Sequence, residues 1–203
     1  HPACLVSWRG SAKAQGKSHS TKLRIPGTTK TSPLALLQWL LLGRGPLASP
    51  GCDHGGFAKV GAGDGDDCDV QFRFLATKSI TPDGMSTISD SYEAAVDHPD
   101  GLTIQTIVAR PKSRAGEVKL ASRDPAAKPV IENAYLDDEA DVMTMVKALR
   151  KARSIAARAP LSAYAAREEF PGDDVADDRA LATYVRKTAH TATQARLARE
   201  QAR

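Results

Sequence analysis

The sequence predicts an α+β domain in which a mostly antiparallel β-sheet is flanked by helices. Three observations lead to this prediction. Apolar and polar residues alternate with a period of two in short segments between residues 69 and 132, which is typical of strands. Apolar residues recur at steps of three and four over residues 138–158, which is typical of an amphipathic helix. The two kinds of segment do not alternate strictly, so neighbouring strands are expected to pair without helical crossovers.

Residues 1–31 are expected to form a polar arm or linker. They contain six Lys or Arg and no acid, so they carry +6, and the remaining 172 residues of the +4 chain sum to −2. Such a stretch can hold nucleic acid or an anionic surface. The charges are spread among Ser, Thr and Gly, however, and Trp8 is the only aromatic residue among them. A solvated loop is therefore the preferred interpretation, and no nucleic-acid partner is expected.

A helix is predicted from Pro33 to Leu42. Ser32 can cap its free amides, Pro33 suits the first helical position, and Gly43 can end it. The apolar run within it has about half of the roughly 20 residues that a membrane-spanning helix needs. We therefore expect a buried helix and no transmembrane segment. The amino terminus also lacks the pattern of a signal peptide.

Four strands are predicted after a Gly- and Pro-rich loop. In the first, from Asp69, Val70, Phe72 and Phe74 share one face, and Gln71, Arg73 and Leu75 share the other. The others are expected at residues 102–110, 117–121 and 129–132. The predicted helix at 138–158 has acids at its start and basic residues at its end, which suits the helix dipole, and another helix is expected near Asp177. No internal repeat is present.

Two short motifs could mark a ligand site, but neither has the surrounding elements or the residue spacing that such a site requires. Gly61, Gly63 and Gly65 resemble a phosphate loop but lack a strand-then-helix unit around them, so a flexible loop is expected. Cys52, with His54 and Cys68, does not have the paired spacing of structural zinc. No metal site is predicted.

The cysteines leave two interpretations open. Cys52 could be a thiolate nucleophile assisted by His54, or a small buried residue. The odd count of three cysteines favours a reducing compartment or a single functional thiol.

Arg73 is the most informative single residue. It lies within VQFRFL, and a strand interior is a costly place for a permanent charge unless the charge is paired. Two interpretations stay open. Arg73 forms an internal ion pair with an aspartate, or it offers its fork of N–H donors to the carboxylate of a ligand.

Three segments, in order along nearly the whole chain, resemble the glucose–methanol–choline (GMC) oxidoreductase family. His1-Pro2-Ala3 resembles the end of the family's N-L-Q-D-H-P segment, which lies in the middle of those proteins. Residues 43–57 (GRGPLASPGCDHGGF) are similar to the family's G-x-G-P-L-A-S…G-G-F. Residues 110–141 are similar to its R-P-x-S-x-G-x-V-x-L-x-S-x-D-P…P-x-I…N-Y-L…D segment.

The resemblance implies the carboxyl-terminal, substrate-binding domain of such an enzyme, with FAD as the cofactor of the full-length protein. It implies that the flavin-binding Rossmann half, which would be this chain's partner, is absent from the chain, so flavin binding by the chain alone is doubtful. The expected organisation is an arm or linker over residues 1–31, the substrate-binding domain over residues 32–191, and a divergent or truncated tail over residues 192–203.

Within the family, the segments PGCDHGGF, DVQFRFL and the turn at residues 82–87 most resemble the fatty acid photodecarboxylases of algae. By that resemblance, Cys52 and Arg73 match the cysteine and arginine that bracket the fatty-acid carboxylate beside the flavin. The implied reaction is light-driven decarboxylation of a long-chain fatty acid to a hydrocarbon, and the implied location is the chloroplast. The arginine would hold the carboxylate close and ionised.

Two positions depart from the family patterns. Ile88 replaces an expected tyrosine. Gln194 stands where alcohol-oxidising members have a base histidine, four residues after His190, and glutamine cannot take a proton at neutral pH. The photodecarboxylases also lack that histidine, so Gln194 favours them. Two alternatives are kept: an FAD-dependent oxidoreductase of the family that acts on CH–OH donors and has lost its carboxyl terminus, and a non-catalytic fatty-acid- or anion-binding remnant.

Overall fold

The computed structural model describes residues 1–17, 22–23, 25, 31–49, 52, 54–61, 67–84, 100–113 and 116–192. Its centre is an antiparallel sheet with the strand order β2-β3-β4-β1-β7, in which β8 also pairs with β1. The strands are β1 (Pro2–Gly10), β2 (His54–Ala58), β3 (Val70–Leu75), β4 (Gly101–Val108), β7 (Ala165–Phe170) and β8 (His190–Thr191). The predicted α+β class is confirmed.

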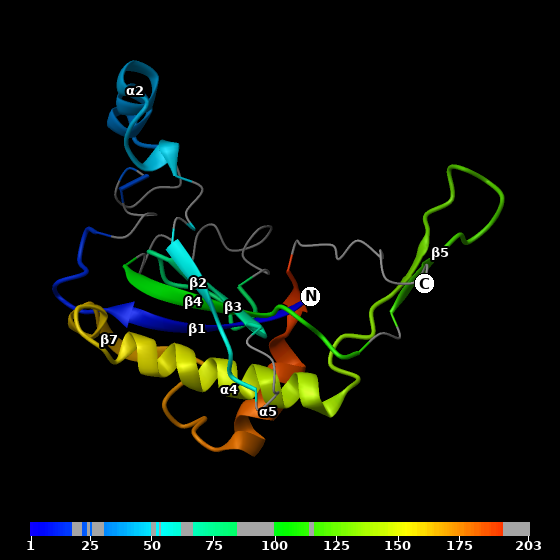
Figure 1. The fold of residues 1–203 in the computed structure, drawn as a ribbon. Coiled ribbons are helices and arrows are strands. Elements are labelled where there is room, and N and C mark those ends of the chain that lie inside the picture. Colours follow the sequence, from blue (N-terminus) through cyan, green and yellow to red (C-terminus); the bar gives the residue numbers. More distant parts are fainter. Residues whose placement is uncertain are drawn as a thin grey trace.

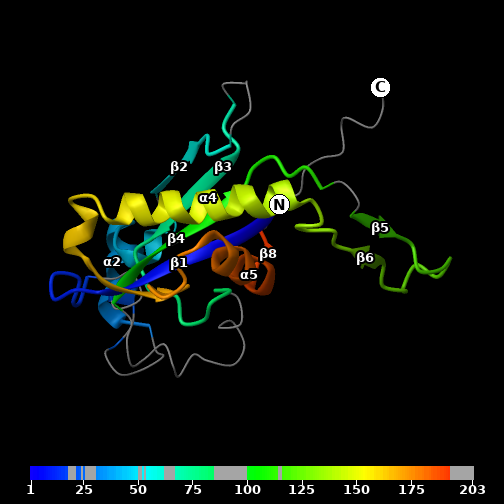
Figure 2. The same ribbon diagram turned by 90° about the horizontal axis from the view of Figure 1, so that it is seen from below.

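Two helices cover one face of this sheet (Figures 1 and 2). Helix α4 (Glu139–Ala156) begins where the Asp138 carboxylate accepts a hydrogen bond from the amide of Ala140 at 2.8 Å, and its apolar stripe is buried. It ends two residues before the predicted end at residue 158. Helix α5 (Asp178–Thr188) is capped by Asp177 and lies beside α4. Both predicted helices are confirmed.

The prediction of a solvated arm over residues 1–31 is wrong for β1. Its residues from Pro2 to Trp8 are buried, and β1 lies in the middle of the sheet, with β4 on one side and β7 and β8 on the other. Helices α4 and α5 cover one face of β1, and the loop after β3 covers Leu5 and Ser7 on the other. The residues of β1 therefore form a nearly continuous apolar run without the alternation that identifies a half-exposed strand. The sequence pattern also does not predict strands β2, β7 and β8.

Alternate residues of the central strands point to opposite faces of the sheet. The core against α4 and α5 receives Cys4 and Val6 from β1, Phe72 from β3 and Ile104 from β4. The residues that alternate with these along each strand point to the opposite side of the sheet, away from the helices. We call this second side the open face. It holds Leu5, Ser7, Arg73, Leu75, Thr103 and Gln105.

The apolar helix α2 (Pro33–Leu42) forms as predicted but is not buried. The Ser32 hydroxyl accepts a hydrogen bond from the Ala35 amide at 3.4 Å, and Gly43 ends the helix with a left-handed φ of 60°. Ala35 is its only fully buried residue. Figure 1 shows α2 standing clear of the sheet, next to the short helix η1 (Pro46–Ala48). The apolar run predicts the helix but does not specify what covers it.

The last pair of predicted strands forms a separate hairpin, β5 (Glu117–Lys119) with β6 (Val130–Glu132), which projects from the body (Figures 1 and 2). A short helix η3 (Leu161–Ala163) connects α4 to β7. Within the described ranges, no helix combines the length and the apolar character needed to cross a membrane.

Candidate functional site on the open face

A row of three side chains crosses the open face of the sheet. Arg73 of β3 pairs with Gln105 of β4, and Gln105 pairs with Leu5 of β1. Directly paired residues on neighbouring strands point to the same side of a sheet. The row therefore places a guanidinium, an amide and an apolar side chain next to one another, on the face that α4 and α5 leave uncovered.

Arg73 is half-buried, and its strand neighbours Phe72 and Phe74 pack into the core on the opposite side. In the part of the chain that the structure describes, Arg73 has neither an ion pair nor a hydrogen bond with an acid. The nearby acids have other partners: Asp67 is paired with Arg110, and Asp69 accepts hydrogen bonds from two backbone amides. The internal ion pair considered from the sequence thus finds no partner among the described acids.

Cys52 lies two residues before β2 and is exposed. Gly55 of β2 pairs with Arg73, so the strand pairing brings the segment that holds Cys52 alongside Arg73. Among the described residues, the two side chains make no direct interaction. A methyl group at Gly55 would come within 2.4 Å of the Phe72 carbonyl oxygen, so β2 lies close against β3 here. The interpretation of Cys52 as a small buried residue is wrong.

The other motifs of the sequence give no second site. Among the described residues, no group of three His, Cys, Asp or Glu is placed to hold a metal ion. The amide of Gly61 donates to Asp69, whereas Gly63 and Gly65 lie outside the described residues, as do Ile88 and Gln194.

A polar pair next to Arg73 is not evident from the sequence. The amide nitrogen of Gln105 lies 2.9 Å from Nε2 of His190, which β8 places beside β1. An amide nitrogen donates, so Nε2 accepts and the ring proton lies on Nδ1. That Nδ1 is buried and has no hydrogen-bond partner in the described part of the chain. The signal that could have revealed the pair is a glutamine in the run LTIQTIV, whose other residues are aliphatic or threonine.

The pKa of His190 is lowered. Burial disfavours the charged ring, and the backbone at Thr188 and the charge of Asp83 offset this only in part. At neutral pH the ring is therefore uncharged, and its one lone pair, on Nε2, accepts the hydrogen bond from the Gln105 amide. The open face thus combines a neutral histidine with a cationic guanidinium, and Gln105 lies between them in the strand pairing.

A pocket of about 200 Å³ opens at this end of the open face, and Gln105 and His190 line it together with Leu5, Leu75 and Asp83. One wall is the loop after β3. The Ser79 amide donates to two hydroxyls of the sheet, those of Ser7 and Thr103, at 2.9 and 3.0 Å, which fixes the loop over the sheet. The pocket thus has a polar end at His190 and an apolar wall, which suits a ligand with a polar head.

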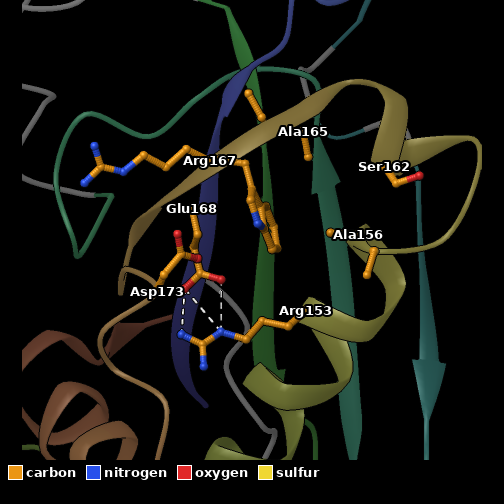
Figure 3. Close-up of a pocket in the computed structure, with 10 residues that line it drawn as sticks. Arg153, Ala156, Ser162, Ala165, Arg167, Glu168 and Asp173 are labelled. Atoms are coloured by element: carbon orange, nitrogen blue, oxygen red, sulfur yellow. Dashed lines mark hydrogen bonds and ion pairs between the residues drawn. The ribbon is translucent and has the colours of Figure 1, made fainter.

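Two further cavities lie elsewhere. An apolar groove of about 560 Å³ runs along Phe72, Phe74 and Ile104, on the helix side of the sheet, so the Arg73 side chain does not face it. A cavity of about 400 Å³ lies between α4 and β7 (Figure 3). In Figure 3, Arg153 and Glu168 point toward each other and their charges are already paired, whereas Arg167 points away.

Comparisons with known proteins agree with this architecture. Residues 111–203 match the carboxyl-terminal family model described as GMC oxidoreductase. The chain is 37% identical over 195 residues to a chloroplastic fatty acid photodecarboxylase of Chlamydomonas reinhardtii, a match that covers 94% of this chain and 31% of that protein. It is 31% identical over 163 residues to an oxygen-dependent choline dehydrogenase of Staphylococcus aureus, covering 80% of this chain and 26% of that protein.

A solved structure of an Aspergillus oryzae formate oxidase variant, studied for its FAD modification, has the same fold. It superposes with a TM-score of 0.74 at 18% identity, over 95% of this chain and 35% of that chain. The chain therefore spans about a third of the length of the photodecarboxylase and of the formate oxidase.

Proposed function

The chain belongs to the GMC oxidoreductase family as a carboxyl-terminal, substrate-binding domain, and from that premise we propose that it serves an FAD-dependent enzyme that decarboxylates fatty acids in light. The observation that carries the proposal is Arg73, a half-buried guanidinium on the open face with no acid paired to it among the described residues. The chloroplastic relative supports a plastid location for the same enzyme.

Arg73 would bind the carboxylate of the substrate. A guanidinium in a partly apolar surface is stabilised by a carboxylate that accepts two parallel N–H bonds. The same contact lowers the pKa of the acid and keeps it ionised. It also fixes the position of the carboxyl carbon, so the reacting bond is held in one place.

The open face fits the edge of a flavin ring in one respect. The buried Nδ1 of His190, which has no partner in the described ranges, is a donor that a ring carbonyl or nitrogen could satisfy. The glycine-rich strand–turn–helix unit that would hold the pyrophosphate is not found within the described residues. We therefore expect the isolated chain to bind FAD weakly or not at all, and a purified chain that retains yellow flavin would contradict this.

The chain's residues have distinct roles in the proposed reaction. A bound flavin would supply the excited state that removes one electron from R–COO⁻. Loss of that electron breaks the C–C bond and releases CO2, and return of the same electron together with one proton converts the alkyl radical to R–H. Arg73 positions the carboxylate, and Cys52, at the entrance to β2, would shape the substrate pocket and stand on the route of the returning proton.

The experiment uses the full-length flavoprotein, palmitate and blue light. Arg73→Gln should lower hydrocarbon formation at least about 100-fold, since it removes a charge-assisted pair, and Arg73→Lys should retain part of the rate. Arg110→Gln is the matched control, because Arg110 is an exposed arginine paired with Asp67. Flavin absorbance verifies that each variant is folded and loaded. An Arg73→Gln enzyme as fast as the parent would overturn the proposal.

A second candidate, oxidation of an alcohol, is favoured by His190. His190 is half-buried and uncharged, and its Nε2 would take the proton from a hydroxyl that replaces the Gln105 amide at that atom. Dark reduction of the flavin by choline or a long-chain alcohol, abolished by His190→Gln and unaffected by Arg73→Gln, would select it.

The third interpretation, a non-catalytic binding module, is tested on the chain alone. It predicts that a fluorescent fatty acid binds without flavin and is released by Arg73→Gln, with no light-dependent product from the full-length protein.

A further inference from the structure

Helix α2 has an unusual surface for a helix outside the core. Seven of its ten residues are large hydrophobics that are between 45% and 71% exposed: Leu34, Leu36, Leu37, Trp39, Leu40, Leu41 and Leu42. The helix contains no charged residue. Exposed apolar surface of this kind marks a contact with a partner or a membrane, because water solvates it poorly.

The distribution of these side chains around the helix argues against docking on a partner by a single face. A helix that docks on a protein has one apolar stripe and a polar opposite side. In α2, exposed apolar residues occupy every position from Trp39 to Leu42, which is a full turn, as well as positions 34, 36 and 37. They therefore surround the helix axis. A helix that is apolar on all sides is suited to an apolar medium, which is either the core of a larger protein or a membrane.

The charge of the surrounding sequence favours a membrane over the core of a larger protein. Residues 1–52 contain seven Lys or Arg and no Asp or Glu, and the first acid of the chain is Asp53. Lys22 and Arg44, which lie on either side of α2 in the sequence, are both exposed. Basic residues next to an apolar helix are attracted to the anionic headgroups of a bilayer.

The length of α2 sets how it can meet a bilayer. Ten residues make a helix about 15 Å long, half of the roughly 30 Å hydrocarbon core. Trp39 is 47% exposed, and tryptophan is enriched where hydrocarbon meets headgroups. A shallow position at the interface fits these features.

We propose that α2 is a membrane-surface anchor that inserts into the interface of an anionic lipid bilayer, with the exposed Lys22 and Arg44 on the headgroups. The inference rests on α2 and not on the proposed photochemistry. Vesicle binding needs no flavin, so either proposal can fail without the other.

The β5–β6 hairpin provides a contrast and a control. Val118 and Ile131 are paired and exposed on one side, and the opposite side carries the ion pairs of Lys119 with Glu117 and Glu132 next to the partly exposed Val130. One apolar and one charged side is the pattern of a surface that docks on protein. The hairpin therefore offers exposed apolar residues that are not expected to bind lipid.

The test is flotation of the full 203-residue chain with vesicles of phosphatidylcholine mixed with phosphatidylglycerol. The chain should bind these vesicles, and added salt should weaken the binding. The triple variant Leu34→Gln, Leu37→Gln, Leu41→Gln should bind about tenfold or more weakly, because three apolar side chains no longer enter the interface. The matched control is Val118→Gln, Leu120→Gln, Ile131→Gln, which should bind as the parent does.

Tryptophan emission gives a second measurement. Trp39 should shift to shorter wavelength on vesicle addition and be quenched by lipids brominated near the headgroup, whereas Trp8 is buried and should not respond. Trp39→Phe should remove the shift. Absence of binding, or equal loss in both triple variants, would overturn the proposal. So would an α2 variant that binds vesicles normally but no longer associates with a flavin-binding half, since α2 would then be a protein-docking helix.

Discussion

Arg153 of α4 and Glu168 of β7 form a two-point ion pair, with Nη2 2.6 Å from Oε1 and Nε 3.0 Å from Oε2. The Glu168 side chain is 5% exposed and also accepts a hydrogen bond from the Gly172 amide. The pair joins the long helix to the edge of the sheet beside the cavity of Figure 3.

We expect Arg153→Gln to lower the free energy of unfolding by about 2–4 kcal/mol, because it leaves a buried carboxylate without its cation. Arg150→Gln on the same helix is the control. Arg150 pairs with Asp178 at an exposed site, so its loss should cost less than about 1 kcal/mol. Urea unfolding measures both, and equal costs would contradict a structural role for the Arg153 pair.

The free energy of unfolding should decrease as the pH is lowered from neutral to mildly acidic, because of His190. Its pKa is lowered in the folded chain, so the unfolded chain binds the proton first, near 6.5. The stabilisation is complete above pH 6.5 and is lost as the pH falls toward the lower folded pKa. His190→Asn should flatten this part of the profile of unfolding free energy against pH, whereas substitution of the exposed His54 by Asn should not.

The three cysteines should differ sharply in reactivity. Burial raises the pKa of Cys4 to about 11, and hydrogen bonding to Thr188 and Tyr184 only partly opposes this. Cys52 and Cys68 are exposed. Titration with a thiol reagent at about pH 8 should modify two thiols quickly and the third only after unfolding. In Cys4→Ser, the number of quickly modified thiols should still be two. Quick modification of three thiols in the parent chain would show that β1 opens readily.

Adjacent glycines in β2 should tolerate substitution differently. A methyl group at Gly55 would meet the Phe72 carbonyl oxygen at 2.4 Å, whereas one at Gly56 would meet nothing within 4 Å. Gly55→Ala should push β2 away from Arg73 and cost about 1–3 kcal/mol, and Gly56→Ala should be nearly neutral. Hydrogen exchange of the β2 amides would localise the effect, and equal protection in both variants would contradict it.

Local sequence patterns predict a helix or strand correctly where they agree with the burial of its residues in the fold. In α4 the apolar stripe, the Asp138 cap and the acidic first turn all indicate one helix. The same rules do not predict strand β7, because Arg167, Glu168 and Glu169 have the sequence pattern of a solvent-exposed segment. Glu168 is buried only because Arg153 neutralises it, and Glu169 is largely covered because Lys78 and Arg9 pair with it. Such partners are distant in sequence and cannot be inferred from a local pattern.

The candidate site is predictable in part for the same reason. Arg73 is identifiable as a charge within an apolar strand, but the Gln105–His190 contact depends on the register of β4, β1 and β8. The exposure of α2 is likewise not predictable, because an apolar run specifies a helix and not its surroundings.

The central position of β1 also constrains the order of events on the ribosome. Its partners β4, β7 and β8 begin at Gly101, Ala165 and His190, so β1 emerges long before any strand that can pair with it. The apolar β1 must therefore stay unpaired until β4 has been translated, and it gains its other partners only with β7 and β8. Nascent chains of this topology should depend on chaperones that shield β1, and acquisition of protease resistance should follow synthesis of β7.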